Sequence, residues 1–470
     1  MHEDELVALL REQLLGTERP VVRSGVERLW KTGRGAAGLA LSVVGGRLRG
    51  KGEGLGAADV RAVSQLVSRL GELKGLAMKA GQVLGYIDPT LPPEIRGLLS
   101  VLQTASPASP FPQVEATIRA AFGSRADMLL AGLERQPVSV ASIGQVHRAR
   151  LPDGTEAAVK VRHPGIDEAL QGDFRAAGTG SSFASVLLPG AASSIKGFID
   201  EARTVLLEEC DFSLERERQA TFARLFAQDE VILVPAVEPE WCASSVLTTR
   251  WMPGQSFDAF LAANPSQEVR DRMGIALFSF YIGTLYRHGL FHGDPHPGNY
   301  AFREDGRVVV YDFGCVRSFD SATVLAFAAL VDAVRADEAH GMREALVALG
   351  ARPPGDAESL AMLRTLLRGF FAPLLEQGPR PVHPGSGFEA QQLLRDKRFL
   401  AKLSLPGRFL FLFRLRFGLY AVLARLGAVA DWGAIESQWA EEARRPTSSR
   451  TSGASSASHA GNTSLSSKRT

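Results

Sequence analysis

Residues 291–314, FHGDPHPGNYAFREDGRVVVYDFG, decide how the rest of the sequence is interpreted. Two short apolar runs, residues 299–302 and 307–311, flank the polar turn REDG. Asp-Gly between two strand-like runs is a strong hairpin signal. The predicted hairpin would bring Asn299, at the start of its first strand, close to Asp312, which follows its second strand.

The two histidines of this segment, His292 and His296, lie four residues apart, which is the spacing of a zinc-binding helix. Pro295 and Pro297 stand within or beside that interval. Proline removes a helical hydrogen-bond donor and disfavours helix in the residue before it. Because no third ligand lies nearby in the sequence, we do not predict a zinc site here.

The acidic and amide side chains of the same segment suit phosphoryl transfer. Asp294 precedes Asn299 by five residues, which is the spacing of the catalytic loop of kinases, and Asp312 begins an Asp-Phe-Gly triplet. Oxygens of Asn299 and Asp312 could together hold Mg²⁺, which prefers carboxylate and amide ligands. The plain alternative is a capped turn followed by an ordinary hairpin.

A phosphoryl-transfer site also requires residues upstream, and the sequence offers them in the right order. Lys160 lies in a predicted strand, residues 156–162, directly after the turn PDGT. Residues 139–145, SVASIGQ, stand where a phosphate-covering loop belongs, with one glycine where a Gly-rich loop has three. An acid to pair with the lysine is expected in residues 208–215, EECDFSLE.

The overall pattern predicts an α+β protein of two unlike lobes. Further strands are expected at residues 231–237 and 244–249, and helices at 113–135 and over most of 165–225. We divide the chain into a basic, partly flexible N-terminal arm (1–60), a helical extension (61–135), a small antiparallel-sheet lobe (136–255), a helical lobe (256–440) and a disordered tail (441–470).

Composition narrows the cellular setting. The chain has 470 residues and a net charge of +2, so no global charge argues for nucleic acid. Its three cysteines are far apart and form no CxxC, which favours a reducing cytoplasm over a disulfide framework or a zinc site. The acidic N-terminus lacks a secretion signal pattern. The patterns specify no oligomeric state.

Two segments raise the question of membrane contact. Residues 19–51 carry eight basic residues and one acidic residue, so they form either a loosely held basic arm or a contact with an anionic membrane surface. Residues 403–432 are strongly apolar, but arginines interrupt them. We predict a buried helix there, with a membrane-resting helix as the alternative.

Over residues 66–432 the chain resembles the UbiB (AarF) family of atypical kinases, which are related to the mitochondrial coenzyme Q kinases. The resemblance rests on four motifs: KAGQ at 79–82, ASIGQVH at 141–147, ECD at 209–211 and HGDPHPGN at 292–299. The first looks like the KxGQ signature, which is nearly private to this family. The resemblance implies a bilobal protein-kinase-like fold whose N-terminal helical extension carries KxGQ.

The resemblance also implies a role for each matching residue. Catalytic positions would be Asp294, Lys160 and its helix partner Glu215; nucleotide-binding positions would be Ser139, Val140, Ala141, Ser142 and Lys160; metal ligands would be Asn299 and Asp312; and regulatory positions would be Lys79, Gln82, Glu209 and Asp211. Lys79 and Gln82 would fold back over the active site, with Lys79 near Glu209 and Asp211, and would block ordinary protein substrates. The loop at 139–142 keeps one of the three alanines of the family's loop.

We therefore expect a cytoplasmic, Mg²⁺-dependent atypical kinase or ATPase that binds ATP or ADP. The resemblance adds a link to isoprenoid-quinone or other lipid metabolism, a partner from such a pathway and a peripheral contact with membrane. One alternative is a small-molecule kinase of the aminoglycoside or choline type, which lacks the KxGQ and ExD motifs. Another is a non-catalytic module that binds nucleotide without turnover.

Overall fold

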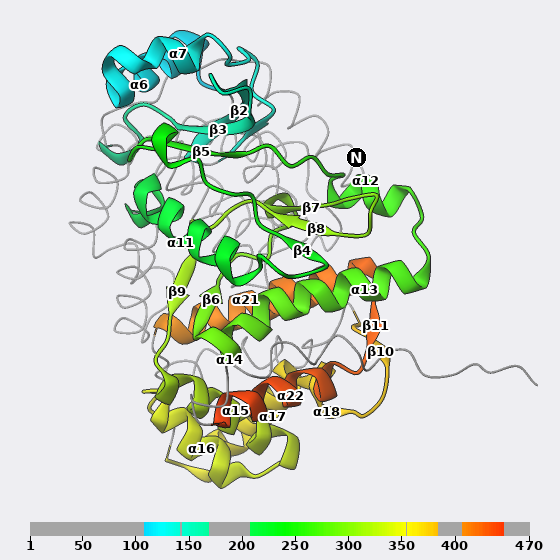
Figure 1. Cartoon of the computed structure of the whole chain (residues 1–470). Helices are drawn as coiled ribbons and strands as arrows, with labels where there is room; N and C mark the ends of the chain where they lie inside the picture. The colour runs from blue at the N-terminus through cyan, green and yellow to red at the C-terminus, as the bar shows by residue number, and fades with distance from the viewer. Residues whose placement is uncertain (1–107, 142, 169–206, 354, 384–406, 446–470) are drawn as a thin grey trace, which may run out of the picture.

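The computed structural model describes residues 108–141, 143–168, 207–353, 355–383 and 407–445. In Figure 1 a small lobe, built on a sheet, lies above a larger lobe that consists mostly of helices. This architecture agrees with the predicted α+β, bilobal kinase-like fold. The expected basic arm, the KAGQ segment, residue 142, most of 165–206 and the C-terminal tail lie outside the described residues.

The small lobe contains a four-stranded antiparallel sheet. Its strands, in spatial order, are β1 (Ser139–Val140), β2 (Gly144–Arg150), β3 (Glu156–Arg162) and β5 (Val246–Arg250). The turn between β2 and β3 is the predicted PDGT hairpin, in which Gly154 takes a φ of 87° and the Asp153 carboxylate accepts the Thr155 N–H. Only a residue without Cβ adopts that φ at little cost.

Two helices cover one face of this sheet, α6 (Phe111–Phe122) and α7 (Ala126–Leu130). Their buried residues pack against alternate residues of β3, because successive side chains of a strand point to opposite faces. The single helix predicted at 113–135 is thus broken, and the break falls at Gly123, which has a φ of 56°. Both helices lie in the segment that we assigned to the helical extension, yet they form part of the small lobe's core.

Helix α11 (Phe212–Leu225) connects the two lobes (Figure 1). It begins where the Asp211 carboxylate accepts the Ser213 N–H at 2.9 Å, a standard N-cap interaction. Near its start, Phe212 packs with residues of the sheet lobe, and further along, Phe222 belongs to the core of the large lobe.

The predicted hairpin of the large lobe is present. Strands β7 (Tyr300–Phe302) and β8 (Val308–Val310) pair antiparallel, with Tyr300 opposite Val310. The strand predicted at 231–237 is shorter, β4 (Ile232–Leu233), and it pairs parallel to β8. The end of the predicted segment still reaches the small-lobe sheet, since Val237 forms a single antiparallel bridge with Thr249 of β5. The Asp229 carboxylate accepts the N–H groups of Val231 and Ile232, which turns the chain toward the hairpin.

The remaining elements belong to the helical lobe. They are α12 (Phe257–Ala262), α13 (Gln267–Phe278), α14 (Thr284–His288), β6 (Leu290–His292), β9 (Val316–Ser318), α15 (Ser321–Ala336), α16 (Ala339–Ala348), α17 (Ala357–Phe370), α18 (Ala372–Leu375), β10 (Arg380–Pro381), α21 (Gly407–Leu426), β11 (Val429–Ala430) and α22 (Trp432–Arg444). A π-helical turn, Ser279–Gly283, joins α13 to α14.

Within the apolar segment predicted as a buried helix, helix α21 ends at Leu426, and strand β11 and the start of α22 follow it. Leu415, Leu419 and Leu423 are fully buried in the large-lobe core, which confirms the prediction over this part. No helix within the described ranges is both long and apolar enough to cross a membrane.

Candidate active site

Lys160, Glu215 and Asp312 meet where the two lobes join. The Lys160 Nζ lies 2.7 and 2.9 Å from the two carboxylate oxygens of Glu215 and 3.1 Å from Oδ2 of Asp312. On β3 the neighbours Val159 and Val161 face α6 and α7, so Lys160 points to the opposite face, toward α11. Strand alternation and the position of α11 therefore assemble the ion pair.

The environment of this lysine keeps it charged. The Lys160 side chain is 13% exposed and that of Glu215 only 2%. Burial alone would lower the pKa of Lys160, but the charges of Asp312 and Glu215 outweigh it and hold the pKa above its ordinary value. An ammonium group fixed in this way is suited to bind phosphate, because it can donate charge-assisted hydrogen bonds to phosphate oxygens as well as to the carboxylates.

Asn299 and Asp312 come together as the hairpin predicted, with one correction. Asn299 does not open the strand; it ends a 3₁₀ turn, Pro297–Asn299, because Pro297 starts that turn and the His296 ring accepts the Gly298 N–H. The Asn299 carbonyl accepts the Tyr311 N–H at 2.9 Å, which places Asn299 beside the residue that precedes Asp312.

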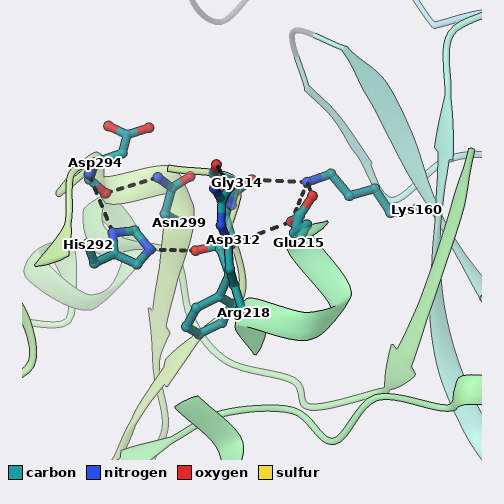
Figure 2. A network of polar contacts seen from close by, with 9 residues as sticks. Lys160, Glu215, Arg218, His292, Asp294, Asn299, Asp312 and Gly314 are labelled. Carbon is teal, nitrogen blue, oxygen red and sulfur yellow. Dashed lines mark hydrogen bonds and ion pairs between the residues drawn. The ribbon is translucent and has the colours of Figure 1, made fainter. Parts of the chain in front are cut away.

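The donor set of this pair fits a magnesium ion. The Asn299 Nδ2 donates to the Asp294 carbonyl at 3.1 Å, which leaves Oδ1 of the amide on the side of Asp312 (Figure 2). Asp312 contributes a carboxylate that is about one-third exposed, at 32%. One amide oxygen and one carboxylate oxygen, completed by waters or phosphate oxygens, are the ligand type that Mg²⁺ takes.

His292 has a structural role in this site that the sequence motifs did not predict. It is fully buried; its Nε2 donates to the Asp312 carbonyl at 2.6 Å, and its Nδ1 accepts the Asp294 N–H at 3.4 Å. Burial lowers the pKa of His292, which agrees with a neutral ring that donates from one nitrogen and accepts at the other. His292 thus ties the loop of Asp294 to the Asp-Phe-Gly segment (Figure 2).

The backbone of Asp294 is held from a second side as well. Tyr281, on the buried π-helical turn, donates its hydroxyl to the Asp294 carbonyl at 3.2 Å, and the same carbonyl accepts from Asn299. Turns of π-helix are frequent at functional sites, and this one aims Tyr281 at the loop. Sequence periodicity contained no signal for it.

The remaining predicted site residues are placed only in part. Asp211 caps α11, and Glu209 is buried beside Gly314, where a Cβ added to that glycine would lie 3.5 Å from the Glu209 Cγ. Ser139 and Val140 form β1, and the Ala141 N–H donates to the Gly144 carbonyl at 2.8 Å in the turn that follows. Ser142, Lys79 and Gln82 lie outside the described residues.

The two-lobed fold and the arrangement of charged residues between the lobes are those of a kinase-like protein. Comparison with known protein families leads to the same class. Residues 101–346 match the family described as the ABC1 atypical kinase-like domain. The chain therefore belongs to the ABC1 (UbiB/AarF) family of atypical kinases.

Several curated relatives carry kinase names. The chain is 28% identical to Protein ACTIVITY OF BC1 COMPLEX KINASE 7, chloroplastic, of Arabidopsis thaliana, over 75% of this chain and 50% of the relative. It is 27% identical to Atypical kinase COQ8, mitochondrial, of Saccharomyces cerevisiae, over 74% of this chain and 69% of the relative. The chain thus spans about half the length of the first of these relatives.

A solved structure shares the architecture. In the complex of Rv3197 with erythromycin from Mycobacterium tuberculosis, the matched protein is 27% identical, with a TM-score of 0.57 over 81% of this chain and 95% of that chain. These relatives favour the atypical-kinase reading over the small-molecule kinase alternative.

Proposed function

We propose that this protein binds ATP or ADP together with Mg²⁺ where its two lobes join, and that it acts as an atypical kinase or ATPase. The observation that carries the proposal is the contact of Lys160 with both Glu215 and Asp312. Phosphoryl transfer by protein kinases requires a strand lysine paired with a helix acid, and an Asp-Phe-Gly aspartate in place to hold Mg²⁺.

Each residue has a distinct task in this proposal. Lys160 grips phosphate oxygens, and Glu215 holds the lysine in place. Asp294 orients the attacking hydroxyl or water, since it occupies the position of the catalytic-loop acid. The segment that consists of strand β1 and the turn after it covers the nucleotide. Its sequence has one alanine and one glycine, so both ATP and ADP are candidates and their binding should be compared.

The metal site consists of Asn299 and Asp312. A bound Mg²⁺ would neutralise charge on the phosphates. Asp312 is oriented by the protein's own backbone, because its Oδ1 accepts the Gly314 N–H at 3.0 Å. The amide of Asn299 is likewise fixed through Asp294, so both ligands are preorganised.

The substrate side of the proposal rests on family membership. We propose a role in isoprenoid-quinone or other lipid metabolism, with the protein in the cytoplasm and in peripheral contact with membrane. Lys79 and Gln82 would guard the site against protein substrates, with Glu209 and Asp211 as their counterparts. Replacing Lys79 should then raise autophosphorylation, and unchanged autophosphorylation would count against the guard.

Thermal unfolding of the purified protein, with and without Mg²⁺ and ATP or ADP, tests the nucleotide site. A ligand that binds only the folded state stabilises it, by about 2.7 kcal/mol at a concentration 100 times its Kd. We expect a Mg²⁺-dependent rise of the midpoint in the wild type and none in Asp312→Asn. No rise with either nucleotide in a folded sample would refute the site assignment. It would also argue against the alternative of a non-catalytic module that binds nucleotide.

A further inference from the structure

Helix α11 touches the Asp-Phe-Gly segment through three residues on one face. Glu215, Arg218 and Phe222 are spaced by three and four positions, which places them on the same side of a helix. Glu215 lies 3.5 Å from the Phe313 N–H, and the Phe222 and Phe313 rings pack with their centroids 5.1 Å apart. Between them along the helix, Arg218 makes the shortest contact: its Nη1 donates to the Gly314 carbonyl at 2.7 Å.

Arg218 is itself held by Glu208, an acid that lies in the run 208–215 but precedes the ECD motif. The Nη2 of Arg218 donates to Oε2 of Glu208 at 2.6 Å, and Arg317 donates to the same oxygen. Burial alone would raise the pKa of Glu208, but the hydrogen bonds from the two arginines outweigh it and lower the pKa, so the carboxylate is charged. All three side chains are largely covered, with 18% of Arg218, 28% of Glu208 and 24% of Arg317 exposed.

The side chains of this cluster come from three different segments of the chain that surround the site. Glu208 precedes α11, Arg218 lies on α11, and Arg317 lies on β9. Strand β9 pairs with β6, where Arg317 is opposite Phe291, three residues before Asp294. The guanidinium fork of Arg218 spans two acceptors at once, which a lysine ammonium cannot reproduce in the same geometry.

Gly314 is the residue through which the cluster reaches the metal ligand. Its N–H donates to Oδ1 of Asp312, and its C=O accepts from Arg218. The surroundings of this glycine are tight, since an added Cβ would lie 3.3 Å from Asp312 Oδ1 and 3.5 Å from Glu209 Cγ. A rotation of the Gly314 backbone would therefore move the hydrogen bond that orients the Asp312 carboxylate.

We infer that Arg218, held by Glu208 and Arg317, is a positioning residue that fixes Gly314 and thereby orients Asp312 for the divalent cation. The consequence for the metal rests on the proposed function; the effect on residues 312–318 does not. Groups that orient a metal ligand typically change metal affinity by about 10- to 100-fold when they are removed.

The test compares Arg218→Met with Arg218→Lys and with a matched control, Arg216→Met. Arg216 lies on the same helix, is 36% exposed and pairs only loosely with its neighbour Glu217, at 3.8 Å. Two quantities are measured for each variant. The first is the Mn²⁺ concentration that half-saturates the protein in excess ADP, followed by the electron paramagnetic resonance of free Mn²⁺. The second is hydrogen–deuterium exchange of residues 312–318 without ligand.

If the inference is right, Arg218→Met raises the half-saturating Mn²⁺ concentration by about 10-fold or more. Exchange in 312–318 is then faster, Arg218→Lys is intermediate, and Arg216→Met matches the wild type. If the wild type binds no Mn²⁺ with ADP while Arg218→Met still speeds exchange in 312–318, the proposed function fails and the positioning role stands. Unchanged exchange and Mn²⁺ binding in a folded Arg218→Met protein, or equal changes in Arg216→Met, would overturn the inference.

Discussion

The Lys160 ammonium lies 2.7 Å from the Glu215 carboxylate, although 55 positions separate the two residues in the chain. A third charge, Asp312, lies 152 positions beyond Lys160 and contacts the same ammonium. These three charged side chains therefore connect the small-lobe sheet, helix α11 and the Asp-Phe-Gly segment. Its strength can be tested by removing one charge at a time.

Glu215→Gln should lower the free energy of unfolding by about 3 kcal/mol. Removing one partner of a buried ion pair typically costs 3–5 kcal/mol, and we expect the lower end because Asp312 still contacts Lys160. Urea denaturation measures the change. The control is Glu217→Gln on the same helix, where the side chain is 68% exposed and the expected change is about 0.5 kcal/mol or less. Equal effects of the two substitutions would contradict the prediction.

Asp294→Asn should separate binding from turnover. The contacts that hold this loop are made by the backbone of Asp294 with Tyr281, His292 and Asn299, so the substitution leaves them in place. We expect the Mg²⁺-dependent nucleotide shift to persist while turnover falls by about 100-fold or more, the usual range for loss of a general acid or base. Turnover and thermal shift are measured on the same preparation. Turnover close to that of the wild type would remove Asp294 from its proposed role.

Arg416→Met should be among the most destabilising single changes in the helical lobe. Arg416 is fully buried and binds Glu436, which also accepts from the Tyr286 hydroxyl at 2.7 Å. Loss of the arginine leaves a buried carboxylate without its cation, which typically costs about 3–5 kcal/mol. Urea denaturation gives the value.

A matched control for Arg416 lies on the same helix α21. Arg425 pairs with Asp258 at the surface, with 54% and 82% of the two side chains exposed. Exposed ion pairs contribute about 0–1 kcal/mol, so Arg425→Met should be nearly silent. The double substitution Arg416→Met with Glu436→Leu should recover part of the loss. A double variant that is less stable than Arg416→Met alone would argue against an uncompensated charge as the cause.

His147 should make stability depend on pH. Its ring is fully buried between the Glu134 carbonyl and Gln145, and burial lowers its pKa below the ordinary value of 6.5. Between the two pKa values the unfolded chain binds the proton and the folded chain does not. The free energy of unfolding should therefore be intact above about pH 6.5 and decline as the pH falls below it.

Denaturant unfolding at a series of pH values checks this dependence. Buried His292 and the more exposed His288 also have lowered pKa values and contribute in the same direction, so His147→Gln should flatten the decline only in part. The exposed His340, with 83% of its side chain accessible, supplies the control, and His340→Gln should reproduce the wild-type profile. If the free energy of unfolding of His147→Gln fell more steeply with decreasing pH than that of the wild type, the direction assigned to the pKa shift of His147 would be wrong.

Much of the site could be predicted because its signals are local. Turn residues and alternating strands placed Lys160 after the PDGT hairpin, and the REDG hairpin brought Asn299 to Asp312. Spacing within residues 291–314 also separated the kinase-like arrangement from a zinc helix, since Pro297 starts a 3₁₀ turn and the two histidines have unrelated partners. Each of these features depends on residues that are close in sequence.

Local patterns in the sequence therefore specify the elements and the chemical groups they carry. Which groups meet depends on tertiary packing: the pairing of β4 with β8, the contact of Tyr281 with Asp294, and the Glu208–Arg218–Arg317 cluster. Such contacts join positions far apart in the chain, and they form because packing the two lobes excludes water and leaves each buried polar group to find a partner. Local periodicity carries no information about that choice.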